Sequence, residues 1–521
     1  MREIDYGKLY TYRELEEVIL DLGKEYPDMM RVSTLATTEE GRNIYLVEIT
    51  DNVNSPETEK KPGYYAQASI HASEASGGTV SLHLMETLLK EKPEILKEVV
   101  FYIVPRVNPD GVEDNLLHNA PNRSRRYLDE RAKGNLFYAK DIDGDGLIMQ
   151  MRVKNPLGAY REDAPGVMVL RQPGEIEGEF YDVYTEGEFE NYDGLPARPA
   201  YRSYDYNRCF PMKWKSRRDS TAYPGKSIEN RAILEFLTTH LNIFAGLDFH
   251  NGQNAVLRPP MCEDSQIDRG DLTTIIEVGE LASKIMGFPL IHEYKYAKYP
   301  RVLPGNSNDF AYSVMGISHY VIELGNGFND IGLSTPEYLA CTKRDSYYKN
   351  IREYSEKEGY EVFRDFKPFN HPQLGEVEIG GRIDGRAYFQ NPKVLANIAP
   401  KTTEFMLKHA AMRPYLKVDS CECVNVGGDI YRIRAQVKNL GIFGTKVMKS
   451  AEGYESEYPV YMFLQSDKEF EVLSRPGVYD LQKLAPLGGA QTEWFVRKDK
   501  DTVIEVCAEH PKAVNSKVLV K

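Results

Sequence analysis

The sequence predicts an α/β domain followed by a small all-β sandwich. In the first part, apolar runs that resemble strands alternate with helical patterns, which is typical of a parallel or mixed sheet with helices on its faces. After residue 412 the pattern changes to short strands of alternating polarity, separated by Gly, Asn and Asp turns, as in a β-sandwich. We therefore expect two domains, at 1–412 and 413–521.

The elements of the first domain follow from their residue patterns. Apolar residues recur with helical spacing around 12–22, and the apolar run that begins at Glu98 closes at Asn-Pro-Asp-Gly, a strong turn signal. A hairpin at 371–383 and a helix at 400–412 are expected to close the domain. The other expected strands lie within 44–50, 63–71, 98–111, 244–252 and 318–327, and the other expected helices within 77–91, 227–241 and 270–287.

Residues 129–200 interrupt the α/β pattern. This segment is acidic and rich in Gly, Asp, Glu and Tyr. A structureless loop of this length is unusual inside a compact domain. We therefore interpret it as a functional insertion with some structure of its own.

Composition and charge exclude several classes of function. The chain has 521 residues, a net charge of -13 and 41% apolar residues. An acidic protein lacks the basic footprint that nucleic acids or anionic membranes require, and no apolar run approaches the ~20 residues of a membrane span. The N-terminus shows no secretory signal, and the cysteines are scattered without a Cys-x-x-Cys pair, so we expect free thiols and a cytoplasmic location.

Polar residues stand where several of the expected strands end. His71 and Glu74 follow one strand, Asn108 follows the next, and His250 and Glu323 end two others. Open α/β sheets bind ligands at the carboxyl ends of their strands. Two histidines and one glutamate are also a ligand set of catalytic zinc. Singly, His71 with Glu74 could be a polar turn and His250 a structural histidine, so it is their convergence that favours a metal site.

Six separated motifs carry a family resemblance through most of the first 410 residues. They are "HASE", "NPDG", "NRSRR", "YDYNRCF", "DFH" and "YVIELGNG", and their order is similar to that of the zinc metallocarboxypeptidases, the carboxypeptidase A/B-like family. The resemblance implies a mixed eight-stranded sheet flanked by helices, and one zinc ion held by His71, Glu74 and His250.

The resemblance also implies roles for other residues. Glu323 matches the general base, and Arg126 matches the arginine that polarises the scissile carbonyl, chosen over Arg123 and Arg125 by family spacing. The remaining matches are Asn207 and Arg208 for the substrate's terminal carboxylate, Asp205 behind the first zinc histidine, Asn308 and Asp309 for the specificity pocket, and Tyr299 for the substrate-capping tyrosine, where Tyr296 and Tyr294 compete.

Physical chemistry supports these roles independently. Bound zinc lowers the pKa of its water toward about 7, so that a nearby carboxylate can take the proton. A planar arginine recognises a free carboxylate through two hydrogen bonds, which selects chain ends over internal bonds. Asp205 would fix the tautomer of His71 by accepting its second N–H.

A second metal site is one interpretation of the insertion. Asp141, Asp143 and Asp145 alternate like the start of a calcium loop, in which alternate carboxylates point inward. Position twelve of that loop would be Arg152 rather than glutamate. A plain Asp/Gly turn is the other interpretation.

Together these features predict a zinc exopeptidase whose partner is a peptide or protein with a free C-terminal carboxylate. One alternative is an enzyme of the same fold that cuts peptidoglycan stem peptides or a similar amide. Another is a non-catalytic binding protein in which the β-sandwich recognises the ligand. The His71–Glu74–His250 set with Glu323 disfavours the latter.

Overall fold

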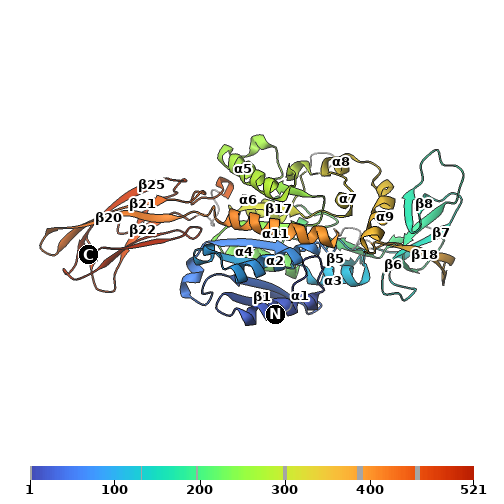
Figure 1. Ribbon diagram of the computed structural model, residues 1–521, viewed down its shortest axis with the longest axis horizontal. Helices are drawn as coiled ribbons and strands as arrows, with labels where there is room; N and C mark the ends of the chain where they lie inside the picture. The colour runs from blue at the N-terminus through green and yellow to red at the C-terminus, as the bar shows by residue number, and fades with distance from the viewer. Residues whose placement is uncertain are drawn as a thin grey trace.

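The computed structural model describes residues 3–130, 132–194, 197–296, 302–383, 391–451 and 458–520. Figure 1 shows an elongated molecule in which a central α/β domain separates a β-rich subdomain at one end from a terminal β-domain at the other. The predicted fold class, a mixed sheet flanked by helices with additional β-structure at the C-terminus, is confirmed.

An eight-stranded mixed sheet forms the centre of the α/β domain. Its order is β1 (Met30–Thr37), β2 (Asn43–Ile49), β4 (Val100–Val104), β3 (Gly63–Ala68), β14 (Ile243–His250), β17 (Ser318–Glu323), β15 (Ala255–Arg258) and β16 (Leu290–His292). The middle strands β4, β3, β14 and β17 are parallel to one another. Parallel strands covered on both faces are apolar throughout, and every residue of β3 and β14 is buried.

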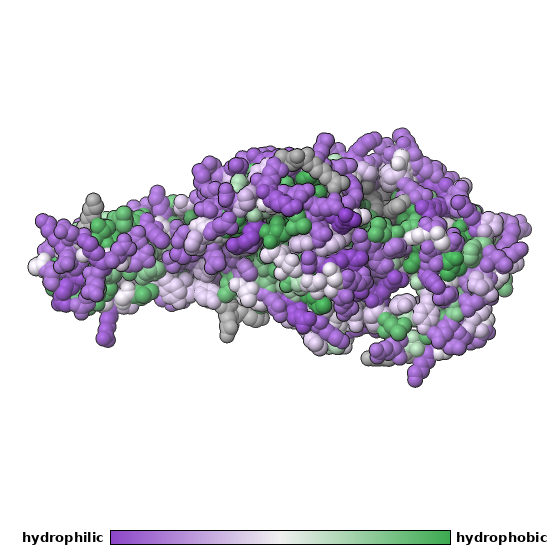
Figure 2. Space-filling model, turned by 90° about the horizontal axis from the view of Figure 1, so that it is seen from below, coloured by the Kyte–Doolittle hydropathy of each residue, from purple (hydrophilic) through white to green (hydrophobic). Residues whose placement is uncertain are grey.

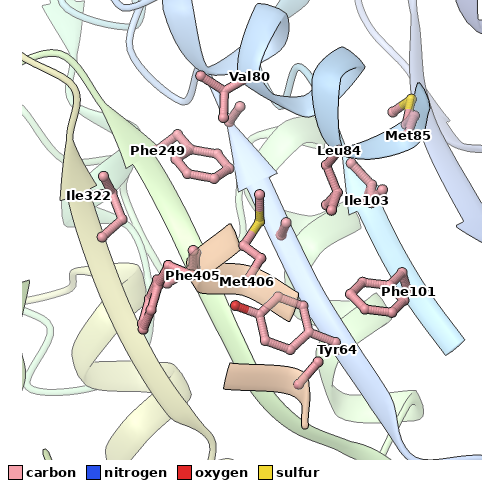
Figure 3. Close-up of a cluster of buried hydrophobic side chains, with 14 of the residues drawn as sticks. Tyr64, Val80, Leu84, Met85, Phe101, Ile103, Phe249, Ile322, Phe405 and Met406 are labelled. Atoms are coloured by element: carbon pink, nitrogen blue, oxygen red, sulfur yellow. The ribbon is translucent and has the colours of Figure 1, made fainter. Parts of the chain in front are cut away.

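Helices cover both faces of this sheet. Tyr64 and Tyr65 are consecutive in β3 and therefore point to opposite faces, each into its own apolar core. The larger core holds α1 (Tyr12–Glu25), α2 (Ser76–Glu91), α5 (Arg269–Met286) and α11 (Pro392–Ala410), and the smaller one holds α4 (Ile228–Thr239) and α6 (Ser307–Ser313). Figure 3 shows Val80 beside Phe249 in the larger core, with Phe405 and Met406 farther along the same face of the sheet. Each fully buried large apolar side chain contributes about 1.5–3 kcal/mol.

Capping residues set the ends of several helices. Thr11 and Glu14 form a reciprocal capping box at the start of α1, and Gly287 ends α5 with a φ of 74°, which favours glycine. The shorter helices are α3 (Pro109–His118), α7 (Gly327–Asp330), α8 (Thr335–Ala340) and α9 (Tyr348–Glu358). The 3-10 turns are η1 (Pro56–Lys60), η2 (Glu94–Lys97), η3 (Tyr206–Arg208), η4 (Asp264–Gln266), η5 (Glu293–Lys295), η6 (Arg344–Tyr347) and η7 (Lys449–Ala451).

The acidic insertion folds as a β-rich subdomain with its own apolar core. Its strands are β5 (Arg125–Leu128), β6 (Leu136–Ala139), β7 (Gln150–Lys154), β8 (Tyr160–Ala164), β9 (Val167–Leu170), β10 (Tyr181–Thr185), β11 (Gly187–Glu190), β12 (Arg198–Pro199) and β13 (Tyr201–Tyr204). The expected hairpin near 371–383 is β18 (Phe363–His371) with β19 (Gly375–Arg382). It does not close the central sheet, because β19 pairs with β7 of the insertion.

The terminal β-domain consists of two four-stranded sheets packed around Trp494. Phe443 and Met448 leave this domain and pack into the larger core of the central domain. Lys512 donates hydrogen bonds from Nζ to the carbonyl oxygens of Met315 and Gly316, at 2.5 and 3.2 Å. The strands are β20 (Leu416–Gly427), β21 (Ile430–Asn439), β22 (Tyr461–Gln465), β23 (Glu471–Val472), β24 (Tyr479–Asp480), β25 (Gly489–Arg497), β26 (Ile504–Glu509) and β27 (Ser516–Val520).

The surface is predominantly polar. On the face seen in Figure 2, hydrophilic residues cover most of the molecule and apolar residues form small separate patches. Among the helices of the described residues, none combines the length and the apolar character that crossing a membrane requires.

Candidate active site

The strand ends singled out in the sequence meet at one edge of the central sheet. His250 and Glu323 end the parallel strands β14 and β17 and lie opposite each other in register. The neighbouring strand β3 ends at Ala68, and Ser69 then turns the chain with a φ of 58°. Asn108 holds this turn, because its Nδ2 donates to the carbonyl oxygens of Ile70 and Ser124, at 3.4 and 2.7 Å.

His71, Glu74 and His250 form a buried cluster at this edge. Their ligand atoms all lie within 4.8 Å of one another. His250 Nδ1 is 2.9 Å from Glu74 Oε2, and the two imidazole centroids are 5.0 Å apart. The exposed fractions are 0% for His71, 5% for Glu74 and 4% for His250, so the three side chains are almost completely shielded from solvent.

The charges around the cluster suit a cation. Burial alone would lower the pKa of His250, but Asp248 and Glu74 raise it well above its ordinary value. A dication would supply this positive charge and leave the imidazole neutral, as a metal ligand must be. Two imidazoles and one carboxylate are the ligand set of several catalytic zinc sites. The residues of the cluster therefore fit a zinc ion.

Both histidines contact polar groups behind the cluster. His250 Nε2 lies 3.3 Å from Asp248 Oδ2. His71 Nδ1 lies 3.1 Å from Ser124 Oγ, whereas its Nε2 is 3.8 Å from Asp205 Oδ1, which is too far for a hydrogen bond. The structure thus brings Asp205 beside His71 as expected, but the group within hydrogen-bonding distance of His71 is Ser124.

Glu323 lies buried next to the cluster. Burial raises its pKa to about 7; His250 lowers this value and Glu74 raises it further. Its Oε2 accepts a hydrogen bond from the backbone N–H of Gly252. A Cβ at Gly252 would come within 2.5 Å of this oxygen, so only glycine permits the approach. A carboxylate that titrates near neutrality is suited to general-base work.

Arg123, not Arg126, is the arginine that contacts the cluster. Arg123 Nη1 donates to Glu74 Oε1 at 2.5 Å, and its Nε lies 3.5 Å from Asp205 Oδ2. Arg126 instead bonds Asp114 at 3.1 Å and lies over the ring of Tyr201. The family spacing that favoured Arg126 thus selects a residue of β5 whose contacts lie outside the cluster.

Asn207 and Arg208 lie on the 3-10 turn η3 beside the cluster. Asn207 Oδ1 accepts from the N–H of Ser307 at 2.8 Å. This contact uses the oxygen of the carboxamide and not its N–H groups. Arg208 Nη1 donates to the carbonyl oxygen of Asn207 at 2.5 Å, and its Nη2 lies 3.7 Å from Asp205 Oδ2. Burial lowers the pKa of Arg208, partly countered by Asp205. The guanidinium is therefore a buried cation without a carboxylate at hydrogen-bonding distance among the described residues.

Asn308 and Asp309 are buried at the start of α6. Asn308 Nδ2 donates to Glu293 Oε2 at 2.7 Å, and Asp309 Oδ1 accepts from the N–H of Met261 at 2.8 Å. Burial raises the pKa of Glu293 to about 8, with Asp309 adding to the effect and Arg208 opposing it. The expected specificity residue Asn308 thus carries an acidic neighbour, Glu293, that the sequence did not reveal.

The expected capping residue Tyr299 lies outside the described residues. Its competitor Tyr296 is described. The hydroxyl of Tyr296 accepts from the N–H of Gln253 at 2.7 Å and lies 3.1 Å from the carbonyl oxygen of the same residue. A Cβ at Gly252 would lie 2.5 Å from this hydroxyl and 2.5 Å from the carboxylate of Glu323. Tyr296 and Glu323 therefore both pack against Gly252.

Asp141, Asp143 and Asp145 gather in the loop of the insertion. Their carboxylate oxygens lie within 4.8 Å of one another. Asp141 accepts from the N–H groups of Gly144 and Gly146, and Asp145 pairs with Arg364 at 2.5 Å. These contacts also satisfy a plain turn, so calcium binding stays a prediction.

Several residues of the site escaped the sequence analysis. Asp248 carried one signal, because it is an acid inside an otherwise apolar strand, two residues before His250. The others carried none that one sequence can show, because each reaches the site from a different segment; they are Ser124, Gly252, Glu293 and Ser307.

Comparison with known proteins agrees with this geometry. A family model described as zinc carboxypeptidase matches residues 15–159, and a domain family of unknown function matches 415–521. Mouse carboxypeptidase D is 28% identical over 110 residues, which are 20% of this chain and 8% of that protein. The human carboxypeptidase N catalytic chain is 27% identical over 111 residues, which are 20% of this chain and 24% of that protein. The chain thus matches at most about a quarter of these relatives.

Solved structures of carboxypeptidases are also among the matches. The carboxypeptidase A from Helicoverpa armigera has a TM-score of 0.46 and 15% identity, covering 78% of this chain and 73% of that one. A metallo-carboxypeptidase from Burkholderia cenocepacia has a TM-score of 0.40 and 12% identity, covering 78% and 70%. The family-model match contains His71 and Glu74, and the structure adds His250 and Glu323 to them. Residues 15–159 of the central domain are therefore similar to the zinc carboxypeptidase family.

Proposed function

We propose that this protein is a zinc-dependent carboxypeptidase that removes the C-terminal residue of a peptide. The observation that carries the proposal is the position of Arg208. Its guanidinium is largely buried, and Asp205, the carboxylate that pairs with it, lies 3.7 Å away, beyond hydrogen-bonding distance, and beside the zinc-ligand candidate His71. A buried charge is costly unless it is well paired. A substrate carboxylate could supply a closer pair.

Two side chains are arranged to hold a chain end. The guanidinium of Arg208 can donate two parallel hydrogen bonds to a carboxylate. The carboxamide of Asn207 is oriented by Ser307, whose N–H binds its oxygen, so that its N–H groups can donate to the same ligand. An internal peptide bond offers no carboxylate, so this pair favours exopeptidase over endopeptidase activity.

The neighbouring residues supply the proton transfer and the charge stabilisation. His71, Glu74 and His250 would hold the zinc ion, whose contribution would be to lower the pKa of a water toward about 7. Glu323 takes a proton at its carboxylate and returns it to the departing amine. Arg123, which is 44% exposed and paired with Glu74, can donate to the oxyanion that forms on the scissile carbonyl.

The proposal can be tested with a pool of ordinary peptides and peptidoglycan stem peptides. The zinc-loaded protein is incubated with the pool, and the products are identified by mass spectrometry. We expect loss of single C-terminal residues from ordinary peptides. Cleavage of stem peptides alone would favour the alternative substrate class, and zinc binding with no cleavage of either class would contradict the proposal.

Glu323→Gln is the matched variant for this experiment. It keeps the size of the side chain and removes the basic carboxylate, so we expect unchanged zinc content and loss of turnover. Turnover equal to that of the wild type would contradict the role of Glu323.

A further inference from the structure

A buried hydrogen-bond network connects the zinc-ligand candidate His250 with the carboxylate-binding candidate Asn207. Its centre is Asp248, which is fully buried and carries no assigned role in the mechanism above. Asp248 Oδ2 accepts from Gln67 Nε2 at 2.7 Å and from Ser307 Oγ at 2.6 Å, and lies 3.3 Å from His250 Nε2. Two hydrogen-bond donors and the Nε2 atom of His250 therefore surround one oxygen.

The direction of each hydrogen bond follows from the chemistry of the groups. An ionised carboxylate only accepts, so Gln67 and Ser307 donate to Asp248, and the His250 nitrogen at 3.3 Å can interact favourably with it only when that nitrogen carries a proton. The oxygen of Gln67 is in turn fixed by the hydroxyl of Tyr65, which donates to it at 2.8 Å. The network is therefore polarised in one direction, from its edges toward Asp248.

With a metal bound, the carboxylate of Asp248 would select one tautomer of His250. When Nε2 carries the proton that points to Asp248, the lone pair is on Nδ1, which faces Glu74 at 2.9 Å. A metal ligand needs this tautomer, and carboxylates behind metal-bound histidines commonly impose it. Asp248 would thus influence the metal site through His250, from the side of the ring that faces away from Glu74.

The same carboxylate also reaches the substrate site. The hydroxyl of Ser307 lies 2.6 Å from Asp248 Oδ2 and 3.1 Å from Asn207 Oδ1, and its one proton goes to the nearer, charged oxygen, while the backbone N–H of Ser307 donates to Asn207 Oδ1 at 2.8 Å. Ser307 is the first residue of α6. Its side chain is bonded to Asp248 and its backbone to Asn207, so this one residue joins the two sites. All four groups are buried, with exposed fractions of 1% for Gln67, 0% for Asp248, 3% for Ser307 and 6% for Asn207, so water does not compete with the network.

We propose that Asp248 is a positioning residue that couples two tasks, orienting His250 toward the metal and, through Ser307, orienting Asn207 toward the substrate carboxylate. The inference rests on the proposed function, the first task on its zinc site and the second on its carboxylate site. It predicts that the removal of one buried charge weakens metal affinity and also reduces the preference for a free carboxylate. A purely structural aspartate would affect neither property selectively.

The first measurement is the zinc dissociation constant, determined by chelator competition without substrate. We expect Asp248→Asn to raise it by about 10- to 100-fold, as for other partners of metal-bound histidines. Asp271→Asn is the matched control, because Asp271 is a buried carboxylate that accepts from Tyr312 and from the backbone of the terminal β-domain. Its zinc constant should stay within about threefold of that of the wild type. An unchanged constant in Asp248→Asn would overturn the first task.

The second measurement is the discrimination between a peptide and its C-terminal amide. Affinities of both are measured by calorimetry at saturating zinc in the Glu323→Gln background, which prevents turnover. We expect Asp248→Asn and Asn207→Ala each to lower the acid-over-amide preference. The double variant should discriminate no less than Asn207→Ala alone, because Asp248 acts through Asn207. Additive losses, or an unchanged preference in Asp248→Asn, would overturn the coupling.

Ser307→Ala decides the question if Asp248→Asn does not fold. It removes the hydroxyl that joins the two tasks but leaves the contact between Asp248 and His250. We expect a zinc constant within about threefold of that of the wild type, and a loss of acid-over-amide preference of about two- to tenfold, the range of one hydrogen bond. An intact preference would overturn the coupling. Failure of the wild type to bind zinc would instead contradict the proposed function, so the two failures are distinguishable.

Discussion

At the scale of single residues, the clearest difference between sequence and structure is which arginine lies beside the candidate zinc cluster. Three arginines fall within "NRSRR", and spacing alone cannot say which of them faces the strand ends. In the structure Arg123 lies beside Glu74, while Arg126 is held by Asp114. The assignment of Arg123 is therefore a structural inference.

Arg123→Ala should lower kcat by about 10²- to 10³-fold, the usual effect of removing one oxyanion donor. Arg126→Ala is the matched control and should stay within a few-fold of the wild type. Zinc content is measured alongside, because Arg123 contacts a candidate ligand. The opposite ranking of the two variants would restore the assignment based on spacing.

The pH dependence should report Glu323. Burial raises its pKa to about 7, and a general base works only when it is ionised, so kcat/KM should fall as the pH decreases through this range. A bound dication stabilises the carboxylate, so in the zinc-loaded protein we expect the acidic limb somewhat below that value, at roughly pH 5–7. A kcat/KM that is constant from pH 5 to pH 8 would contradict this role.

At the scale of elements, the sequence predicted best the residues that stand at the ends of strands. The ends of β3, β14 and β17 could be located from apolar runs, and the parallel arrangement then places His71, His250 and Glu323 at one edge. Asp248 was missed because its contacts come from β3 and α6, which are distant in sequence. Contacts of this kind depend on tertiary packing, which periodicity does not describe.

The contact between Glu293 of η5 and Asn308 of α6 gives an element-scale prediction. Glu293 is buried against Asn308, and burial raises its pKa to about 8, with Asp309 adding to the effect and Arg208 opposing it. A C-terminal lysine or arginine side chain would ionise it and form a pair. We expect Glu293→Gln to reduce kcat/KM for lysine-ended peptides by about tenfold relative to leucine-ended ones, the effect of roughly one charged hydrogen bond.

The measurement compares both peptides with the wild type and the variant. An equal change for the two peptides would mean that Glu293 supports the pocket without selecting the side chain.

At the scale of the whole molecule, the sequence predicted an α/β domain followed by a β-domain. It did not predict which strands pair with those of the insertion. Its sheet requires β18 and β19, which lie more than 150 residues after β7–β10 in the chain. Nothing in the local pattern of Phe363–His371 distinguishes a hairpin that extends this sheet from one that closes the central sheet. Long-range strand pairing therefore limited the prediction.

The docking of the terminal β-domain can be tested through Lys512. Its buried Nζ binds two carbonyl oxygens at the end of α6, and its removal leaves them without this partner. Lys512→Met should lower the free energy of unfolding by about 1–3 kcal/mol. Lys517→Met, at an exposed position of β27, should change it by less than about 0.5 kcal/mol. Equal effects of the two variants in chemical denaturation would contradict a docking role for Lys512.

The central claim is that this protein binds zinc and removes residues from free C-termini. The most direct measurement follows, by mass spectrometry, a peptide and its C-terminal amide incubated with the zinc-loaded protein. The account predicts stepwise loss of C-terminal residues from the free acid and little from the amide, because Arg208 and Asn207 require a carboxylate. Equal cleavage of both peptides, or cleavage at internal bonds, would contradict it.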